Sequence, residues 1–201
     1  YKGYWKLRNG SGVNFGIGSS GTNRFWVKIE VVPNSTTLTL PFVSSESGEV
    51  TDSGSTSTTN PRAGDDHVNH SLQLFMSFNI SSIPADAVIT EVTTNLSDYT
   101  TIGTPFDNHG ALFVYKDDYG SLHPGDFVGS TPSTGRLIAW FDTSDLEKTI
   151  ADNDMVNALQ SKVGSSRFKV RFQFSSPTDG DSTGDWLEIN NPVIKVTYYT
   201  P

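Results

Sequence analysis

The strongest constraint on the fold is a period of two in the apolar side chains of two segments that lie far apart in the chain. The apolar positions are Leu72, Leu74, Met76, Phe78 and Ile80 in the first segment, and Phe168, Val170, Phe172 and Phe174 in the second. Polar residues fill most of the positions between them, among them Gln73 and Ser77 in the first segment and Lys169 in the second. Such alternation is typical of a β-strand that turns one face to the core. Both segments are therefore predicted to be central strands with one buried and one solvent-facing side.

Further segments of this kind bring the predicted number of strands to about nine. Their ranges are 24–32, 38–43, 72–80, 88–96, 111–116, 136–141, 167–174, 186–189 and 192–199. One helical pattern interrupts them at 143–164, where Ser144 can act as a cap and the Asp152–Asp154 stretch divides the pattern into two short helices near 145–163. Many short strands with turn signals and few helices favour an all-β fold, an antiparallel β-sandwich of jelly-roll type.

Two parts of the chain differ in character. Residues 1–37 form a predicted N-terminal arm, in which six glycines before position 23 alternate with large aromatic residues such as Tyr4 and Trp5. Residues 38–201 form the predicted β-sandwich domain. Inside that domain the polar segment 44–66 is predicted to be a long loop.

The arm contains an extended segment, residues 24–32, whose partner sheet the sequence leaves open. A strand that folds back on its own domain belongs to a self-contained module, whereas one that adds to a neighbouring copy makes a polymer. The side chains predicted to carry such an addition are Phe25, Trp26, Val27, Ile29 and Val31.

Composition excludes several classes of function. The net charge of −8 and the isoelectric point near 4.8 provide no positive field for nucleic acid or anionic lipid. No apolar run approaches the ~18 residues of a membrane span. With no cysteine, stability must come from packing, ions or association. Together with the abundance of Ser, Thr, Asn and Gly and a start at Tyr1, these features predict an exported protein of the extracellular space or cell surface.

Three stretches resemble the DNRLRE-type β-sandwich domain of secreted prokaryotic proteins. They are "SFNISSIPADAVITEVTTNLS" (77–97), "VYKDDYGSLHPGDFVG" (114–129) and "NNPVIKVTYY" (190–199). The resemblance covers residues 40–199 and departs from the family pattern at Asn79, where Asp is usual, and at Asp86, where Gly is usual. It implies a β-sandwich, and its members occur as carbohydrate-binding modules and as domains of surface proteins. Fold alone does not assign activity.

A loop before the last strands contains the best candidate metal ligands. Asp179, Asp181 and Asp185 alternate there with Gly180 and Gly184, a flexible segment that offers the hard oxygen ligands preferred by Ca²⁺. Asp65, Asp66, Asp117 and Asp118 are candidates for sharing this site. The competing interpretation is a solvated turn, because Asp and Gly favour turns for local reasons.

Other motifs bear on modification and catalysis. Five Asn-x-Ser/Thr motifs make N-glycosylation a hypothesis, with acceptors Asn9, Asn34, Asn69, Asn79 and Asn95. No nucleophile elbow, phosphate-binding loop or cysteine nucleophile is present, so we expect no enzymatic activity. Of the remaining aromatics, Trp140 and Trp186 follow strand alternation and are predicted to lie in the core rather than on a sugar-stacking platform.

Two functions fit these observations. The first is a non-catalytic structural subunit of an extracellular filament or surface assembly, polymerising head to tail by addition of the N-terminal strand to a neighbouring copy. The alternative is a carbohydrate-binding module with exposed aromatics, a structural calcium ion and a polysaccharide ligand.

Overall fold

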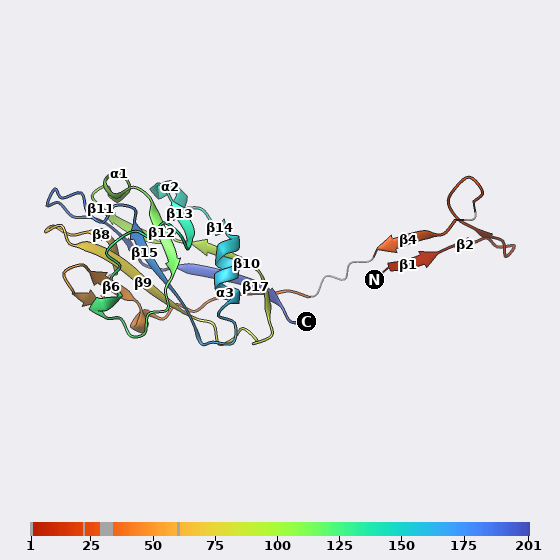
Figure 1. Cartoon of the computed structure of the whole chain (residues 1–201), viewed down its shortest axis with the longest axis horizontal. Helices are drawn as coiled ribbons and strands as arrows, with labels where there is room; N and C mark the ends of the chain where they lie inside the picture. Colours follow the sequence, from red (N-terminus) through yellow and green to blue (C-terminus); the bar gives the residue numbers. More distant parts are fainter. Residues whose placement is uncertain (1, 22, 29–33, 60) are drawn as a thin grey trace. The chain divides into compact units, whose positions relative to one another are not determined.

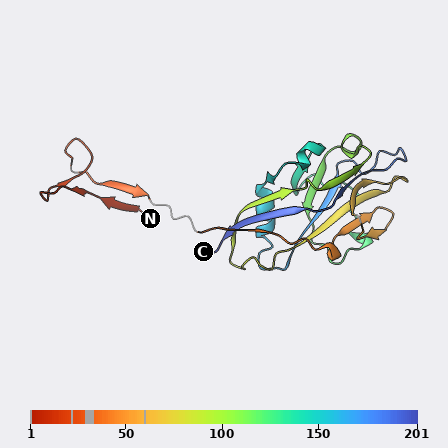
Figure 2. The ribbon, with the colours of Figure 1, turned by 180° about the vertical axis from the view of Figure 1, so that it is seen from behind.

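The chain divides into two compact units, Tyr1–Asn34 and Ser35–Pro201. The computed structural model describes residues 2–21, 23–28, 34–59 and 61–201, and it is drawn in Figure 1 and, from behind, in Figure 2. The first unit is called the arm below and the second the sandwich. The unit boundary falls before residue 37 because Thr36–Thr39 already forms β5, a strand of the sandwich.

The sandwich consists of antiparallel sheets, as the alternation in the sequence predicted (Figure 1). The larger sheet has the order β11-β16-β8-β9-β15-β12-β13, with β6 beside β9 and β7 beside β6; the smaller has the order β14-β10-β17-β5. The strands of the larger sheet are β6 Gly48–Thr51, β7 Thr56–Ser57, β8 Arg62–Asp65, β9 Ser71–Asn79, β11 Tyr99–Ile102, β12 Leu112–Lys116, β13 Arg136–Trp140, β15 Arg167–Phe174 and β16 Asp185–Ile189. The remaining strands of the smaller sheet are β10 Val88–Asn95, β14 Ile150–Ala151 and β17 Val193–Tyr199.

The main core lies between the two sheets and is built from the predicted apolar faces. Among its largest fully buried members are Leu74, Met76 and Phe78 of β9, with Phe168 and Phe172 of β15. The register of β9 and β15 places Phe78 opposite Phe168 and Leu74 opposite Phe172, so the two alternations coincide on one side of the sheet. Matching apolar faces on paired strands fixes the register, because a shift by one residue would expose the whole set.

The prediction that β9 turns its polar face to solvent is wrong. Residues 117–135 cover this side, where Phe75 is buried against Tyr119 with ring centroids 5.1 Å apart. The buried Gln73 donates to the Val128 carbonyl at 2.7 Å and accepts from its amide at 3.0 Å. The covering segment thus supplies the hydrogen bonds that a buried polar face requires.

The polar segment 44–66, predicted to be a loop, contributes strands β6, β7 and β8 and a short 3-10 helix, η1 Ser44–Glu46. β6 pairs along β9, and β8 extends the sheet toward β16. Glu49 of β6 is almost fully buried and accepts from the Arg62 guanidinium of β8 at 2.7 and 2.8 Å. This two-point ion pair neutralises the buried carboxylate and links the two strands.

The helical pattern at 143–164 forms two short helices, α2 Thr143–Leu146 and α3 Asn153–Gln160, as predicted. The caps differ from the expected Ser144: Asp142 accepts from the Asp145 amide, and Asp152 accepts from the amides of Asp154 and Met155. A carboxylate at this position satisfies otherwise unpaired helix amides. Two further short helices, α1 Pro105–His109 and η2 Pro124–Asp126, lie in the connections of the larger sheet. None of the helices in the described part of the chain has the length and apolar character needed to cross a membrane.

Glu46 joins η1 to the edge of the larger sheet. Its carboxylate accepts from Arg167 Nε at 2.8 Å and from Ser77 Oγ at 2.8 Å. These hydrogen bonds, that of Arg167 first, lower the pKa of Glu46 from 4.5 to about 2. The carboxylate form is therefore favoured by the fold.

We expect this carboxylate to contribute to stability in a pH-dependent way. Because the folded-state pKa is lowered, the contribution is complete above about pH 4.5 and is lost as the pH falls toward about 2. In Glu46→Gln the melting temperature should fall relative to wild type at pH 6, and the difference should shrink at pH 2.5. Asp86→Asn, at an exposed carboxylate with no ion pair among the described residues, is the control. A Glu46→Gln difference that stays constant between these pH values contradicts the assignment.

Candidate functional site

A buried polar cluster holds the ends of the loops near the predicted metal ligands. Asp65 at the end of β8 accepts from Thr178 Oγ1 at 2.7 Å, from the Asp185 amide at 3.2 Å and from His109 Nε2 at 3.2 Å. His109 Nε2 also lies 3.1 Å from the Asp185 carbonyl. Since both neighbours of Nε2 are acceptors, this nitrogen carries the hydrogen. The side chains of Asp65 and His109 are fully buried.

The structure brings the three predicted metal ligands together. One carboxylate oxygen from each of Asp179, Asp181 and Asp185 lies within 4.8 Å of the others. Asp185 is buried at the start of β16, whereas Asp179 and Asp181 are exposed in the preceding loop. Local hydrogen bonds shape the loop, because Asp179 accepts from the Asp181 amide and Asp181 accepts from the Thr183 amide.

The donor chemistry of this cluster suits Ca²⁺, but its number of ligands is small. Calcium takes roughly six to eight oxygen ligands, and the cluster provides three carboxylates. Each of the four other acidic candidates has partners of its own. The Asp65 carboxylate accepts from His109 and Thr178, and Asp66 accepts from the amides of Val68 and His70. Asp117 pairs with Arg171 at 2.9 Å, and Asp118 pairs with Lys162 at 2.6 Å. Calcium binding stays a prediction.

The arm is a pair of two-stranded ribbons. β1 Lys2–Trp5 pairs antiparallel with β4 Phe25–Lys28, and β2 Leu7–Arg8 pairs with β3 Asn14–Phe15. The backbone of Phe25, Trp26 and Val27 thus lies in a strand that already has a partner within the arm, while Ile29 and Val31 lie outside the described residues. Within the described residues β4 has one strand neighbour, so its second edge has no strand partner.

Exposed apolar surface is concentrated on the arm. Nine large apolar side chains are exposed in the described part of the chain, and six of them belong to the arm: Tyr4, Trp5, Leu7, Val13, Phe15 and Ile17. The buried core residues of the described chain all lie in the sandwich. An isolated ribbon is marginal in water, and a unit shorter than ~40 residues without disulfide or metal usually needs association to be stable.

The arm and the sandwich also carry opposite charge. Residues 1–34 contain five Lys or Arg and one Glu, a net charge of +4, which leaves −12 for residues 35–201 out of the total of −8. Lys6, Arg8 and Arg24 are exposed. The two units therefore differ in the sign of their net charge.

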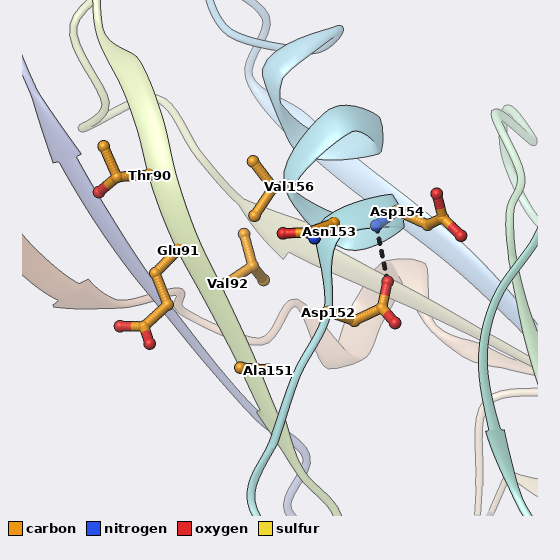
Figure 3. Close-up of a pocket in the computed structure, with 8 residues that line it drawn as sticks. All are labelled: Thr90, Glu91, Val92, Ala151, Asp152, Asn153, Asp154 and Val156. Atoms are coloured by element: carbon orange, nitrogen blue, oxygen red, sulfur yellow. Dashed lines mark hydrogen bonds between the residues drawn. The ribbon is translucent and has the colours of Figure 1, made fainter.

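A cavity of the sandwich lies where β10 faces α3 (Figure 3). It has a volume of about 500 Å³, within the range of small-molecule sites. Its lining consists of Thr90, Glu91, Val92, Ala151, Asp152, Asn153, Asp154 and Val156. Figure 3 shows Val92 of β10 and Val156 of α3 pointing toward each other, whereas Glu91 points to the side of β10 away from α3. Ala151 comes from the end of β14. We call this cavity the β10–α3 groove.

The free edge of β10 borders this groove. β14 pairs only with Thr93 and Thr94. At the other end, Gln160 of α3 accepts from the Ile89 amide at 2.7 Å and donates to the Ala87 carbonyl at 3.1 Å. Between these contacts β10 has no strand partner on this side among the described residues. An open strand edge is a template for another strand.

The five predicted glycosylation acceptors differ in environment. Asn9 and Asn34 are exposed, and Asn9 closes the β2–β3 turn by accepting from the amides of Ser11 and Val13. Asn69 is half-buried and bonded to Ser182, and Asn79 and Asn95 are half-buried with their carbonyl oxygens bonded to the Ser at position +2. Glycosylation stays a prediction.

The tryptophans of the sandwich provide no flat exposed platform. Trp140 is fully buried beside Phe172, as predicted. Trp186 is half-buried, with the Arg62 guanidinium 5.0 Å from its ring and His67 edge-on at 5.4 Å.

Sequence reasoning missed the β10–α3 groove because its two walls come from segments about 60 residues apart. The opposite net charges of residues 1–34 and 35–201 could have been recognised from the sequence alone. No model of a known protein family matches this chain, and the search of curated proteins gives no match either.

Proposed function

We propose that this protein is a non-catalytic structural subunit of an extracellular filament or surface assembly, in which the arm of one copy adds to the sandwich of the next. The observation that carries this proposal is the accumulation of exposed large apolar side chains on an arm of only 34 residues. Leaving Tyr4 and Trp5 in water forgoes about 1.5–3 kcal/mol for each large side chain. A neighbouring copy provides the surface that would cover them.

Two further features support association between copies. The arm is positively charged and the sandwich negatively charged, so each copy has two complementary surfaces. Addition of an arm to a different surface of the next copy is heterologous, and such contacts extend into fibres unless a rotation closes them into a ring.

Removal of the arm is expected to abolish assembly. Full-length protein should form oligomers and filaments in light scattering after size exclusion and in negative-stain electron microscopy. A variant lacking residues 1–34 should remain a folded monomer, because all core residues of the described chain lie in the sandwich.

A full-length variant with Trp5→Ser and Phe15→Ser is the second protein to be compared in this experiment. It keeps the chain length and charge but loses two exposed aromatic contacts, and it should assemble only at a concentration at least about tenfold higher. Full-length protein that stays monomeric at all concentrations, with native circular dichroism, contradicts the proposal.

The carbohydrate-binding module stays as the alternative, with the exposed aromatics Tyr4, Trp5 and Phe15 of the arm as the stacking surface. Affinity electrophoresis of the same proteins on alginate, pectin and cellulose separates the two functions. Retardation that is lost with the arm and occurs without assembly favours the module.

A further inference from the structure

We infer that the acceptor on the neighbouring copy is the β10–α3 groove, and that its occupant is the β1–β4 ribbon of the arm, paired through the free edge of β4. This inference rests on the proposed function, because it names the surface on which the arm of another copy docks. Three independent features of the two surfaces agree with it: the backbone, the charge and the length.

The backbone of both partners is available. β4 has one partner, β1, and its other edge is unpaired in the described chain. The edge of β10 between Ile89 and Val92 also has no strand partner there, and at its end the Val92 carbonyl accepts from the Asp152 amide at 3.4 Å. Strand addition at such edges provides main-chain hydrogen bonds without any unfolding of either partner. The arm can therefore dock as the ribbon that the structure shows.

The charges of the two surfaces are opposite. Glu91, Asp152 and Asp154 line the groove, none of them has an ion pair among the described residues, and no Lys or Arg lines it. On the arm, Arg24 directly precedes β4 and Lys28 ends it, and the register places Lys2 opposite Lys28. Glu91 accepts a hydrogen bond from Thr197 and Asp152 caps α3, so neither charge is neutralised by a cation. Docking would bring the arm's cations near these carboxylates, and it would weaken as salt screens the attraction.

The lengths also match. The segment of β10 from Ile89, which contacts Gln160, to Val92, which contacts the Asp152 amide, spans about 10 Å at ~3.3 Å per residue. β1 and β4 are strands of four residues each. Both free edges of β10 and β4 are thus short, which limits pairing to a single register over a few residues.

Charge reversal in the full-length protein tests this surface. Glu91→Lys with Asp154→Lys reverses two exposed carboxylates of the groove and leaves the α3 cap Asp152 in place. The matched control, Asp52→Lys with Asp107→Lys, reverses two exposed carboxylates outside the groove and changes the net charge equally. We expect the groove variant to lose assembly, or to require a concentration at least about tenfold higher, while the control assembles as wild type does.

A compensating change makes the test specific. The double variant Arg24→Glu with Lys28→Glu should also lose assembly. A protein that carries these two changes together with Glu91→Lys and Asp154→Lys should form filaments again. Groove and control variants that assemble equally well overturn the inference and leave the proposed function intact. Wild-type protein that never assembles overturns both.

Cross-linking gives a second readout, because the chain contains no cysteine. Full-length Asn153→Cys and Arg24→Cys proteins, mixed under assembly conditions and oxidised, should yield a covalent heterodimer. Asp107→Cys replaces Asn153→Cys in the control mixture. Assembled protein that gives no more heterodimer from Asn153→Cys than from Asp107→Cys contradicts docking in the groove.

Discussion

Replacing Asp65 with Ala is expected to lower the free energy of unfolding by about 3–5 kcal/mol, because unsatisfied buried hydrogen-bond donors cost about 1–3 kcal/mol each. The carboxylate accepts hydrogen bonds from Thr178, the Asp185 amide and His109. Without it, the buried Asp185 amide and the half-buried Thr178 hydroxyl lose their acceptor, and His109 Nε2 keeps only the Asp185 carbonyl. Since a domain of 150–250 residues changes its melting temperature by about 2–4 °C per kcal/mol, the loss corresponds to roughly 10 °C in thermal unfolding followed by circular dichroism.

Asp65→Asn is the matched control for this substitution. The amide oxygen can still accept from His109 and from the Asp185 amide, and the amide nitrogen can donate to the Thr178 hydroxyl. The free energy of unfolding of Asp65→Asn should therefore lie about 1–2 kcal/mol below that of wild type. Equal melting temperatures for wild type and Asp65→Ala would show that this cluster does not stabilise the fold.

Replacing Trp140 with Ala is expected to lower the free energy of unfolding by about 3–5 kcal/mol, because it leaves a large cavity in a packed core. The indole is fully buried between the sheets and lies 6.1 Å from the ring of Phe172. Denaturant titration should show the loss as a lower transition midpoint with an unchanged slope.

The corresponding Phe variant separates packing from hydrogen bonding. Trp140 Nε1 is buried and has no hydrogen-bond partner, so Trp140→Phe removes an unsatisfied donor while keeping an aromatic ring. We expect a loss of about 1–2 kcal/mol for this change, well below that of Trp140→Ala. Similar losses for the two variants would mean that ring packing contributes little at this position.

The alternation of apolar residues predicted the strands of the sheets, because it reflects the local geometry of a β-strand. It gave wrong predictions where segments distant in sequence cover a strand or pair with it. The apolar face of β9 was placed correctly, but Gln73 on its other face is buried because residues 117–135 cover it. β6 and β8 were missed because they contain Gly48 and Gly64, which are unfavourable in strands. Their pairing depends on β9 and on the Glu49–Arg62 ion pair, contacts that no local pattern contains.

Of the candidate sites, the acidic cluster could be predicted from local sequence, whereas the β10–α3 groove depends on contacts between distant segments. Asp179, Asp181 and Asp185 are close in sequence, and the loop between them is too short to separate their carboxylates widely. The β10–α3 groove required the pairing of β10 with β14 to be known, since its walls come from residues 90–92 and 151–156. Nothing in the local sequence at Glu91 or Asp154 indicates that both residues border one cavity.

The charge of −12 on the sandwich sets a condition on how copies can be arranged. Two such bodies in direct contact repel one another over distances up to the Debye length, about 8 Å in physiological salt. Side-by-side bundling of these bodies is therefore opposed at low ionic strength and promoted by dissolved cations. In the proposed filament, a cationic arm would lie between successive anionic sandwiches, which avoids this repulsion. We therefore expect thin single filaments in dilute buffer, and thicker bundles in concentrated salt as long as the filaments persist.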